Sequence, residues 1–150
     1  LVEWIVCDYN KVEAIQPNTL TTHLFPELKV LNLANNHLSF LPGDFLLNCH
    51  KLRFLDLSSN KLKRLPTSVI TCKNLQLCFL QDNELSELPA DLHLLGELRK
   101  LFVSYNHLTL LPASIGECVK LEKLQVSCNR ITMMPDSIIK LKRCGGEKSL

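Results

Sequence analysis

The stretch Leu52–Pro66, LRFLDLSSNKLKRLP, decides the fold because its spacing recurs along the chain. With Leu52 as position one, leucines stand at positions one, four, six and eleven, an asparagine at nine and a proline at fifteen. The same run begins again at residues 28, 75, 98 and 121, and a weaker copy begins at residue 2. Successive starts are therefore 26, 24, 23, 23 and 23 residues apart. A fixed period of this length predicts a repeat architecture.

Each copy contains a short alternation of apolar and polar residues, such as Leu55-Asp56-Leu57. Period-two alternation predicts a strand with one face inward, and the constant period makes successive strands parallel neighbours about 4.8 Å apart. The leucines of one copy then stack on those of the next, so the array is stable only collectively. The strands are expected at the start of each copy, with their inward residues forming a continuous core.

The asparagine at position nine recurs in every copy. An amide side chain can satisfy backbone groups that the turn after each strand cuts off from water, and can bridge one copy to the next. Its replacement by alanine is expected to leave several such groups unsatisfied, so we interpret the column as structural. Its members are Asn10, Asn36, Asn60, Asn83, Asn106 and Asn129.

The segments after the prolines have a different spacing, with apolar residues three and six places further on. This spacing predicts a single helical or 3₁₀ turn on the outer side of each copy. Narrow strands inside and wider turns outside predict curvature, with the sheet on the concave face. The residues three places after each proline are Phe45, Val69, Leu92, Ile115 and Ile138.

Composition excludes several function classes. The chain has 150 residues, 46% of them hydrophobic, and a formal net charge of +2, so neither nucleic acid nor a membrane is the expected partner.

Cysteine and leucine exchange at one repeat position (Cys49, Cys72, Leu95 and Cys118), which predicts small buried apolar residues there rather than ligands or disulfides. Reduced thiols and the absence of glycosylation sequons predict a cytoplasmic location. Because it opens inside a copy without Met, the chain is expected to be an excised piece.

The pattern L-x-x-L-x-L-x-x-N-x-L followed by x-x-L-P resembles the leucine-rich repeat. Its 23-residue length and LPxxIxxCxxL segment are similar to the intracellular subclass of Ras-suppressor, Scribble and Erbin-like scaffolds and of Roco-type GTPase-kinases. The resemblance implies an α/β solenoid, a horseshoe with a parallel concave sheet and short 3₁₀, irregular or helical convex segments. We expect the repeat domain to span residues 1–143 and residues 144–150 to be a linker or tail.

On this fold, positions three, five, seven and eight are expected to be exposed on the concave face. Across adjacent strands they place an apolar cluster that is flanked by two lysines. We call this set of residues the concave aromatic patch. Exposed aromatic clusters commonly mark interaction surfaces, so a protein partner is expected there. Two alternatives stay open. These residues can be present only because such side chains suit a strand, or another part of the parent protein can cover the patch. The patch comprises Phe54, Leu77, Phe79, Lys100, Phe102, Tyr105 and Lys123.

The interpretation that follows is a scaffold for protein–protein interaction in intracellular signalling, with a small GTPase or another signalling protein as partner. The alternative is a regulatory segment of a larger signalling enzyme whose catalytic domain, Roco-type or phosphatase, lies elsewhere. A receptor ectodomain is a third class, but it predicts disulfide-bonded caps and sequons. No enzyme activity, cofactor or metal is expected, because the five histidines are scattered and Ser58, Ser104 and Ser127 have no histidine placed to activate them.

Overall fold

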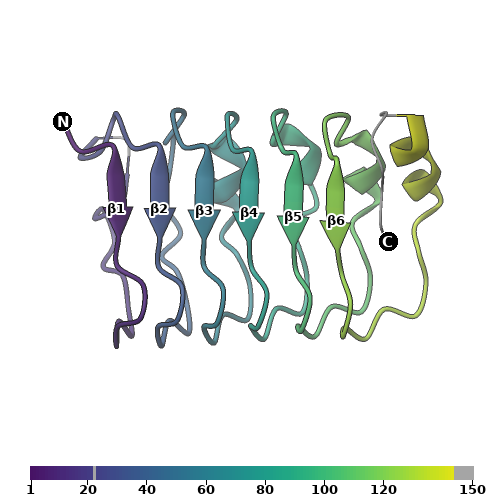
Figure 1. Cartoon of the computed structure of the whole chain (residues 1–150), viewed down its shortest axis with the longest axis horizontal. Coiled ribbons are helices and arrows are strands. Elements are labelled where there is room, and N and C mark those ends of the chain that lie inside the picture. Colours follow the sequence, from purple (N-terminus) through teal and green to yellow (C-terminus); the bar gives the residue numbers. More distant parts are fainter. Residues whose placement is uncertain (22, 144–150) are drawn as a thin grey trace.

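The computed structural model describes residues 1–21 and 23–143, and the predicted tail at 144–150 lies outside the described residues. Six parallel strands form one sheet in chain order, and each begins at position three of its copy (Figure 1). The register pairs equivalent positions throughout: Phe54 with Leu77, for example, and Phe79 with Phe102. The strands are β1 (Trp4–Val6), β2 (Val30–Asn32), β3 (Phe54–Asp56), β4 (Leu77–Phe79), β5 (Lys100–Phe102) and β6 (Lys123–Gln125).

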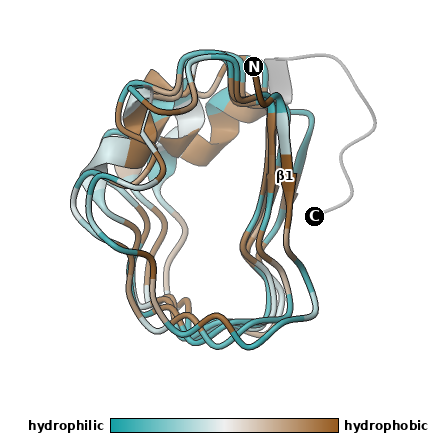
Figure 2. Ribbon diagram, turned by 90° about the vertical axis from the view of Figure 1, so that its left-hand side faces the viewer, coloured by the Kyte–Doolittle hydropathy of each residue, from teal (hydrophilic) through white to brown (hydrophobic). Residues whose placement is uncertain are grey.

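Viewed along the stack of coils, the strands run down one side and the helical turns lie across from them (Figure 2). The 3₁₀ helices are η1 (Thr67–Thr71), η2 (Leu92–Leu94), η3 (Ala113–Glu117) and η4 (Asp136–Arg143). The prediction of a helical turn after each proline is therefore correct for four copies and wrong for the second. There Leu46 and Asn48 have φ values of 57° and 60°, and these left-handed residues break the helix that Pro42 could have started.

The core is the predicted leucine spine. In the four middle copies the residues at positions one, four, six and eleven are at most 5% exposed. In the first and last copies several equivalents are only half-buried, because each lacks a neighbouring coil on one side among the described residues. A fully buried leucine contributes about 1.5–3 kcal/mol, and the stack obtains that contribution only where a second coil covers it.

The asparagine column bridges consecutive coils as predicted. In each of five copies the side-chain oxygen accepts from the backbone N–H at position eleven of the preceding coil, at 2.9–3.0 Å. The side-chain nitrogen donates to the position-six carbonyl of that coil, at 2.9–3.0 Å. The residue just before it, at position eight, is left-handed in all six copies, with φ between 51° and 56°. That conformation turns the chain out of the strand and the asparagine inward.

Candidate binding surface

Three phenylalanines form a continuous row across the sheet. The ring centroids of Phe54 and Phe79 are 5.4 Å apart at an interplanar angle of 41°, and those of Phe79 and Phe102 are 4.8 Å apart and nearly parallel, at 3°. The close pair follows from the register, which puts Phe79 directly opposite Phe102 on β4 and β5. All three rings are half-buried and none belongs to the leucine spine. The row therefore offers ring edges and faces to solvent on the open side of the sheet.

The two lysines of the patch differ in their surroundings. Lys123 is half-buried, and its ammonium lies 5.4 Å from the centroid of the Phe102 ring, a cation–π contact. Lys100 is exposed and stands opposite Lys123 in the register of β5 and β6. Leu77, at the same position on β4, is half-buried beside them. The sheet thus brings the predicted residues of β3 to β6 onto one face.

Next to the stacked rings lies a hollow of about 490 Å³. It is lined by Phe79, Phe102 and Gln125 at position five and by residues at positions seven and eight, including Gln81 and Tyr105. Tyr105 is 58% exposed. The pKa of its phenol is raised, chiefly by the neighbouring Cys128 thiol and, to a lesser degree, by burial and by Asp82. Tyr105 is therefore a neutral hydrogen-bonding group at the rim of the hollow.

Gln81 is a residue that the sequence interpretation missed. Its side-chain oxygen is buried and has no hydrogen-bond partner among the described residues. The signal was present in the sequence, because position seven otherwise holds only small or short residues, from Asp8 to Ser127. A long amide side chain in that column is the exception, and it falls in the same copy as Phe79.

The prediction that position seven is exposed is wrong for two copies. Ser58 is 6% exposed and Ala34 is 4% exposed. The Ser58 hydroxyl donates to Asp56 Oδ1 at 2.6 Å, and the same oxygen accepts from the Ser58 backbone N–H at 2.9 Å. This short side chain is held against the Asp56 carboxylate and is shielded from solvent. Ser58 therefore does not contribute to the exposed surface.

The cysteines behave as small apolar residues. Cys49, Cys72 and Cys118 are at most 2% exposed, as their exchange with leucine predicts. Burial raises the pKa of the Cys49 and Cys118 thiols to about 11 and that of Cys78 to about 12, and it also raises the pKa of Cys72. Cysteines 7, 49, 72, 78, 118 and 128 are free thiols. Within residues 1–21 and 23–143 no group of three His, Cys, Asp or Glu side chains is arranged to hold a metal ion.

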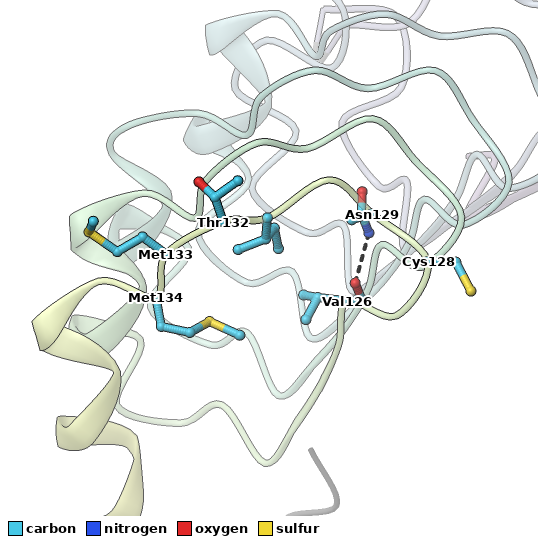
Figure 3. Close-up of a pocket in the computed structure, with 7 residues that line it drawn as sticks. Val126, Cys128, Asn129, Thr132, Met133 and Met134 are labelled. Atoms are coloured by element: carbon cyan, nitrogen blue, oxygen red, sulfur yellow. Dashed lines mark hydrogen bonds between the residues drawn. The ribbon is translucent and has the colours of Figure 1, made fainter.

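A second hollow, of about 280 Å³, lies at the end of the last coil, where Val126, Thr132 and Met134 line it (Figure 3). Asn129 donates to the Val126 carbonyl at 2.9 Å there. Met133 is 77% exposed and Met134 is 46% exposed. Val126 stands at a spine position, and among the described residues no further coil covers it, so this hollow differs in origin from the concave one.

No helix in the described part of the chain has both the length and the apolar character needed to cross a membrane.

Comparison with solved structures agrees with this architecture. The leucine-rich repeat ectodomain of the plant membrane receptor kinase GASSHO1/SCHENGEN3 from Arabidopsis thaliana, in complex with Casparian strip integrity factor 2, matches 98% of this chain with a TM-score of 0.77 and 30% identity. InlP of Listeria monocytogenes matches 97% with a TM-score of 0.75 and 25% identity. The chain spans 18% and 38% of those two chains. The fold is thus that of a leucine-rich repeat horseshoe, as the sequence pattern predicts.

Among curated proteins, human PH domain leucine-rich repeat-containing protein phosphatase 1 is 41% identical over 51 residues, which are 34% of this chain and 3% of that protein. A family model described as "Leucine rich repeat" matches residues 2–62, 26–77 and 50–108, together well over half of the sequence. The chain therefore belongs to the leucine-rich repeat family.

Proposed function

We propose that this chain is a protein-binding module that holds its partner on the concave aromatic patch. Leucine-rich repeat domains generally mediate protein–protein interaction, and the repeat fold is typically a non-enzymatic binding scaffold. The observation that carries the proposal is the stacked pair of Phe79 and Phe102, half-buried on the open face with Lys123 over one ring. Aromatic groups that a partner can desolvate supply most of the energy in protein interfaces.

The test replaces both rings by aspartate, Phe79→Asp with Phe102→Asp. Proteins captured from a cell extract by the immobilised chain are compared with those captured by the double variant. The matched control, Leu94→Asp with Val119→Asp, alters two apolar side chains that are 44% and 63% exposed on the outer segments. Capture lost with the first pair and kept with the second supports the proposal, while unchanged capture by the first pair refutes it.

Folding must be checked in the same experiment, because Phe79 lies opposite Asp56 in the register and a second carboxylate there is repelled. Far-UV circular dichroism and urea unfolding report whether the double variant remains folded. Phe79→Thr with Phe102→Thr provides a milder pair, since threonine suits a strand and adds no charge. This pair is expected to lose capture as well.

We also propose a cytoplasmic setting, with a signalling protein such as a small GTPase as the partner. Among the described residues six cysteines are free, four of them buried in the core, which suits a reducing compartment. The similarity to the 23-residue subclass of Ras-suppressor and Scribble-like scaffolds supports the signalling context. Binding of the chain to a purified small GTPase in its GTP-bound and GDP-bound forms tests the partner.

A second candidate function is favoured by one observation, the similarity to a human leucine-rich repeat phosphatase over 51 residues. In this proposal the repeats regulate a catalytic domain of the same parent protein. The parent gene decides between the two: a phosphatase, kinase or P-loop signature in the same reading frame favours regulation in cis. An open reading frame that contains no catalytic signature favours the free scaffold.

A further inference from the structure

Lys100 and Lys123 stand directly opposite each other on the adjacent strands β5 and β6. Five basic side chains form ion pairs that connect adjacent coils: Lys29–Glu3, Lys51–Glu27, Arg99–Glu122, Lys120–Glu97 and Lys140–Glu117. Within the residues that the structure describes, Lys100 and Lys123 form none. They face each other in the register of β5 and β6, where two like charges repel. A carboxylate placed between them would remove that repulsion and pair with both.

The hollow beside these lysines suits an apolar side chain. Its volume of about 490 Å³ exceeds that of a single aromatic side chain, and the nearly parallel pair of Phe79 and Phe102 lines it. A third ring placed against this pair would be stacked or edge-to-face with its neighbours, the geometries that aromatic pairs prefer. Gln81 lines the same hollow, and its side-chain oxygen is buried without a hydrogen-bond donor among the described residues. A partner that draws this amide outward and supplies an N–H or O–H to it would end an unfavourable state.

These features follow one another from the strands into the turns after them. The lysines occupy position three, Phe102 position five, Gln81 position seven and Asp82 position eight. Positions three to five lie on the strands, where the rise is about 3.3 Å per residue, and positions seven and eight belong to the turn that follows. Asp82 is exposed and lines the far end of the hollow, where it would repel a second acidic group. The surface is therefore basic at one end, apolar in the middle and hydrogen-bonding at the other.

We propose that the occupant of this hollow is an extended segment of a partner protein with acidic residues at one end, one aromatic residue in the middle and an uncharged hydrogen-bond donor at the other end. The acidic end lies against Lys100 and Lys123, the aromatic ring on Phe79 and Phe102, and the donor against Gln81. This inference rests on the proposed protein-binding function and adds the chemistry of the partner.

The test uses three fluorescein-labelled, acetylated and amidated peptides with the cores Glu-Glu-Phe-Thr-Asn, Lys-Lys-Phe-Thr-Asn and Glu-Glu-Ser-Thr-Asn. Binding to the whole chain is measured by fluorescence anisotropy at 50 mM and 500 mM NaCl. We expect the first peptide to bind at least tenfold more tightly than either of the others at low salt. We also expect part of this preference to be lost at high salt, because exposed charges are screened.

The matched variants are Lys100→Glu with Lys123→Glu on the patch and Lys63→Glu with Lys73→Glu away from it, where both pairs change the net charge equally. The patch pair is expected to reverse the preference between the Glu-Glu and Lys-Lys peptides, while the distant pair leaves it intact. Equal binding of the Glu-Glu and Lys-Lys peptides, equal binding of the Phe and Ser peptides, or no binding at 1 mM overturns the inference. If Phe79→Asp with Phe102→Asp still abolishes protein capture, the proposed function stands and only the partner's chemistry is wrong.

Discussion

Replacing Asn83 by alanine tests how the asparagine column holds the coils together. Its side chain is 7% exposed. Its oxygen accepts from the Leu62 backbone N–H at 2.9 Å, and its nitrogen donates to the carbonyls of Leu57 at 2.9 Å and Leu80 at 3.2 Å. Among the described hydrogen bonds, the one to Asn83 Oδ1 is the only one that the Leu62 N–H donates. The truncation therefore removes bonds to three buried backbone groups.

The three backbone groups differ in whether another hydrogen-bond partner remains. The Leu57 carbonyl also accepts from Asn60 at 3.1 Å, and the Leu80 carbonyl also accepts from Asn106 at 2.9 Å. Only the Leu62 N–H is left without a partner, which corrects the expectation from sequence that several groups would be unsatisfied. An orphaned buried N–H costs about 1–3 kcal/mol, and each lost bond to a carbonyl that keeps another partner costs about 0.5–1.5 kcal/mol. We expect Asn83→Ala to lower the free energy of unfolding by about 3 kcal/mol.

Asn10 provides the control within the same column. It is exposed, and its nitrogen bonds only within its own copy, to the carbonyls of Asp8 at 2.9 Å and Cys7 at 3.3 Å. Asn10→Ala is therefore expected to cost less than about 1 kcal/mol. Urea unfolding followed by circular dichroism gives both values, and native-state hydrogen exchange reports on the Leu62 amide itself. Equal destabilisation by the two variants, or unchanged protection of Leu62 in Asn83→Ala, would refute the reasoning.

Two further predictions concern the outer segments and the buried thiols. A Cβ on Gly116 would lie 2.0 Å from the backbone oxygen of Ser137. Gly116→Ala should therefore push η4 away from η3 and lower the free energy of unfolding, measured in urea, by about 1–3 kcal/mol. Gly96→Ala is the control: a Cβ there has nothing within 4 Å, and the change should be no more than about 0.5 kcal/mol. Equal effects at the two glycines would show that the close approach is unimportant. Burial raises the pKa of the Cys49 and Cys118 thiols from 9.0 to about 11 in the folded chain. As the pH rises, the thiols of the unfolded chain therefore ionise before those of the folded chain. Their contribution to stability is complete below pH 9 and falls between pH 9 and 11. The free energy of unfolding should decline less steeply with pH across this range in Cys49→Ala with Cys118→Ala than in the unchanged chain. The same slope in both would contradict the assignment.

The spine and the asparagine column were predictable because they depend on local periodicity. A side-chain period of two fixes which strand residues point inward, and a constant repeat length places equivalent residues side by side. Leu55, Leu57 and Asn60 therefore lie where the pattern puts them. The patch was predictable to the same extent, since position five of adjacent copies must pair across the sheet, as Phe79 and Phe102 do.

The outcomes that the pattern missed depend on conformations that differ between copies. Leu46 adopts a left-handed conformation in a segment that shares its proline and its first apolar position, Phe45, with the helical copies but has Asn48 at the second. Ser58 is buried against the Asp56 carboxylate, whereas Gln81, at the same position one coil later, lines the concave hollow. A repeat pattern averages over copies, so such differences are visible only in the packing of each one.

The amino-acid sequence by itself determined the parallel stack, its leucine core and the face on which the aromatic residues stand, because each of these follows from backbone geometry and a repeated spacing. The tertiary structure alone decided that Phe79 and Phe102 are stacked 4.8 Å apart, that Lys123 lies over the second ring, and that Gln81 borders a hollow beside them. The reason is physical: side-chain torsions are set by contacts with neighbours on other coils, and no spacing along a single chain encodes them.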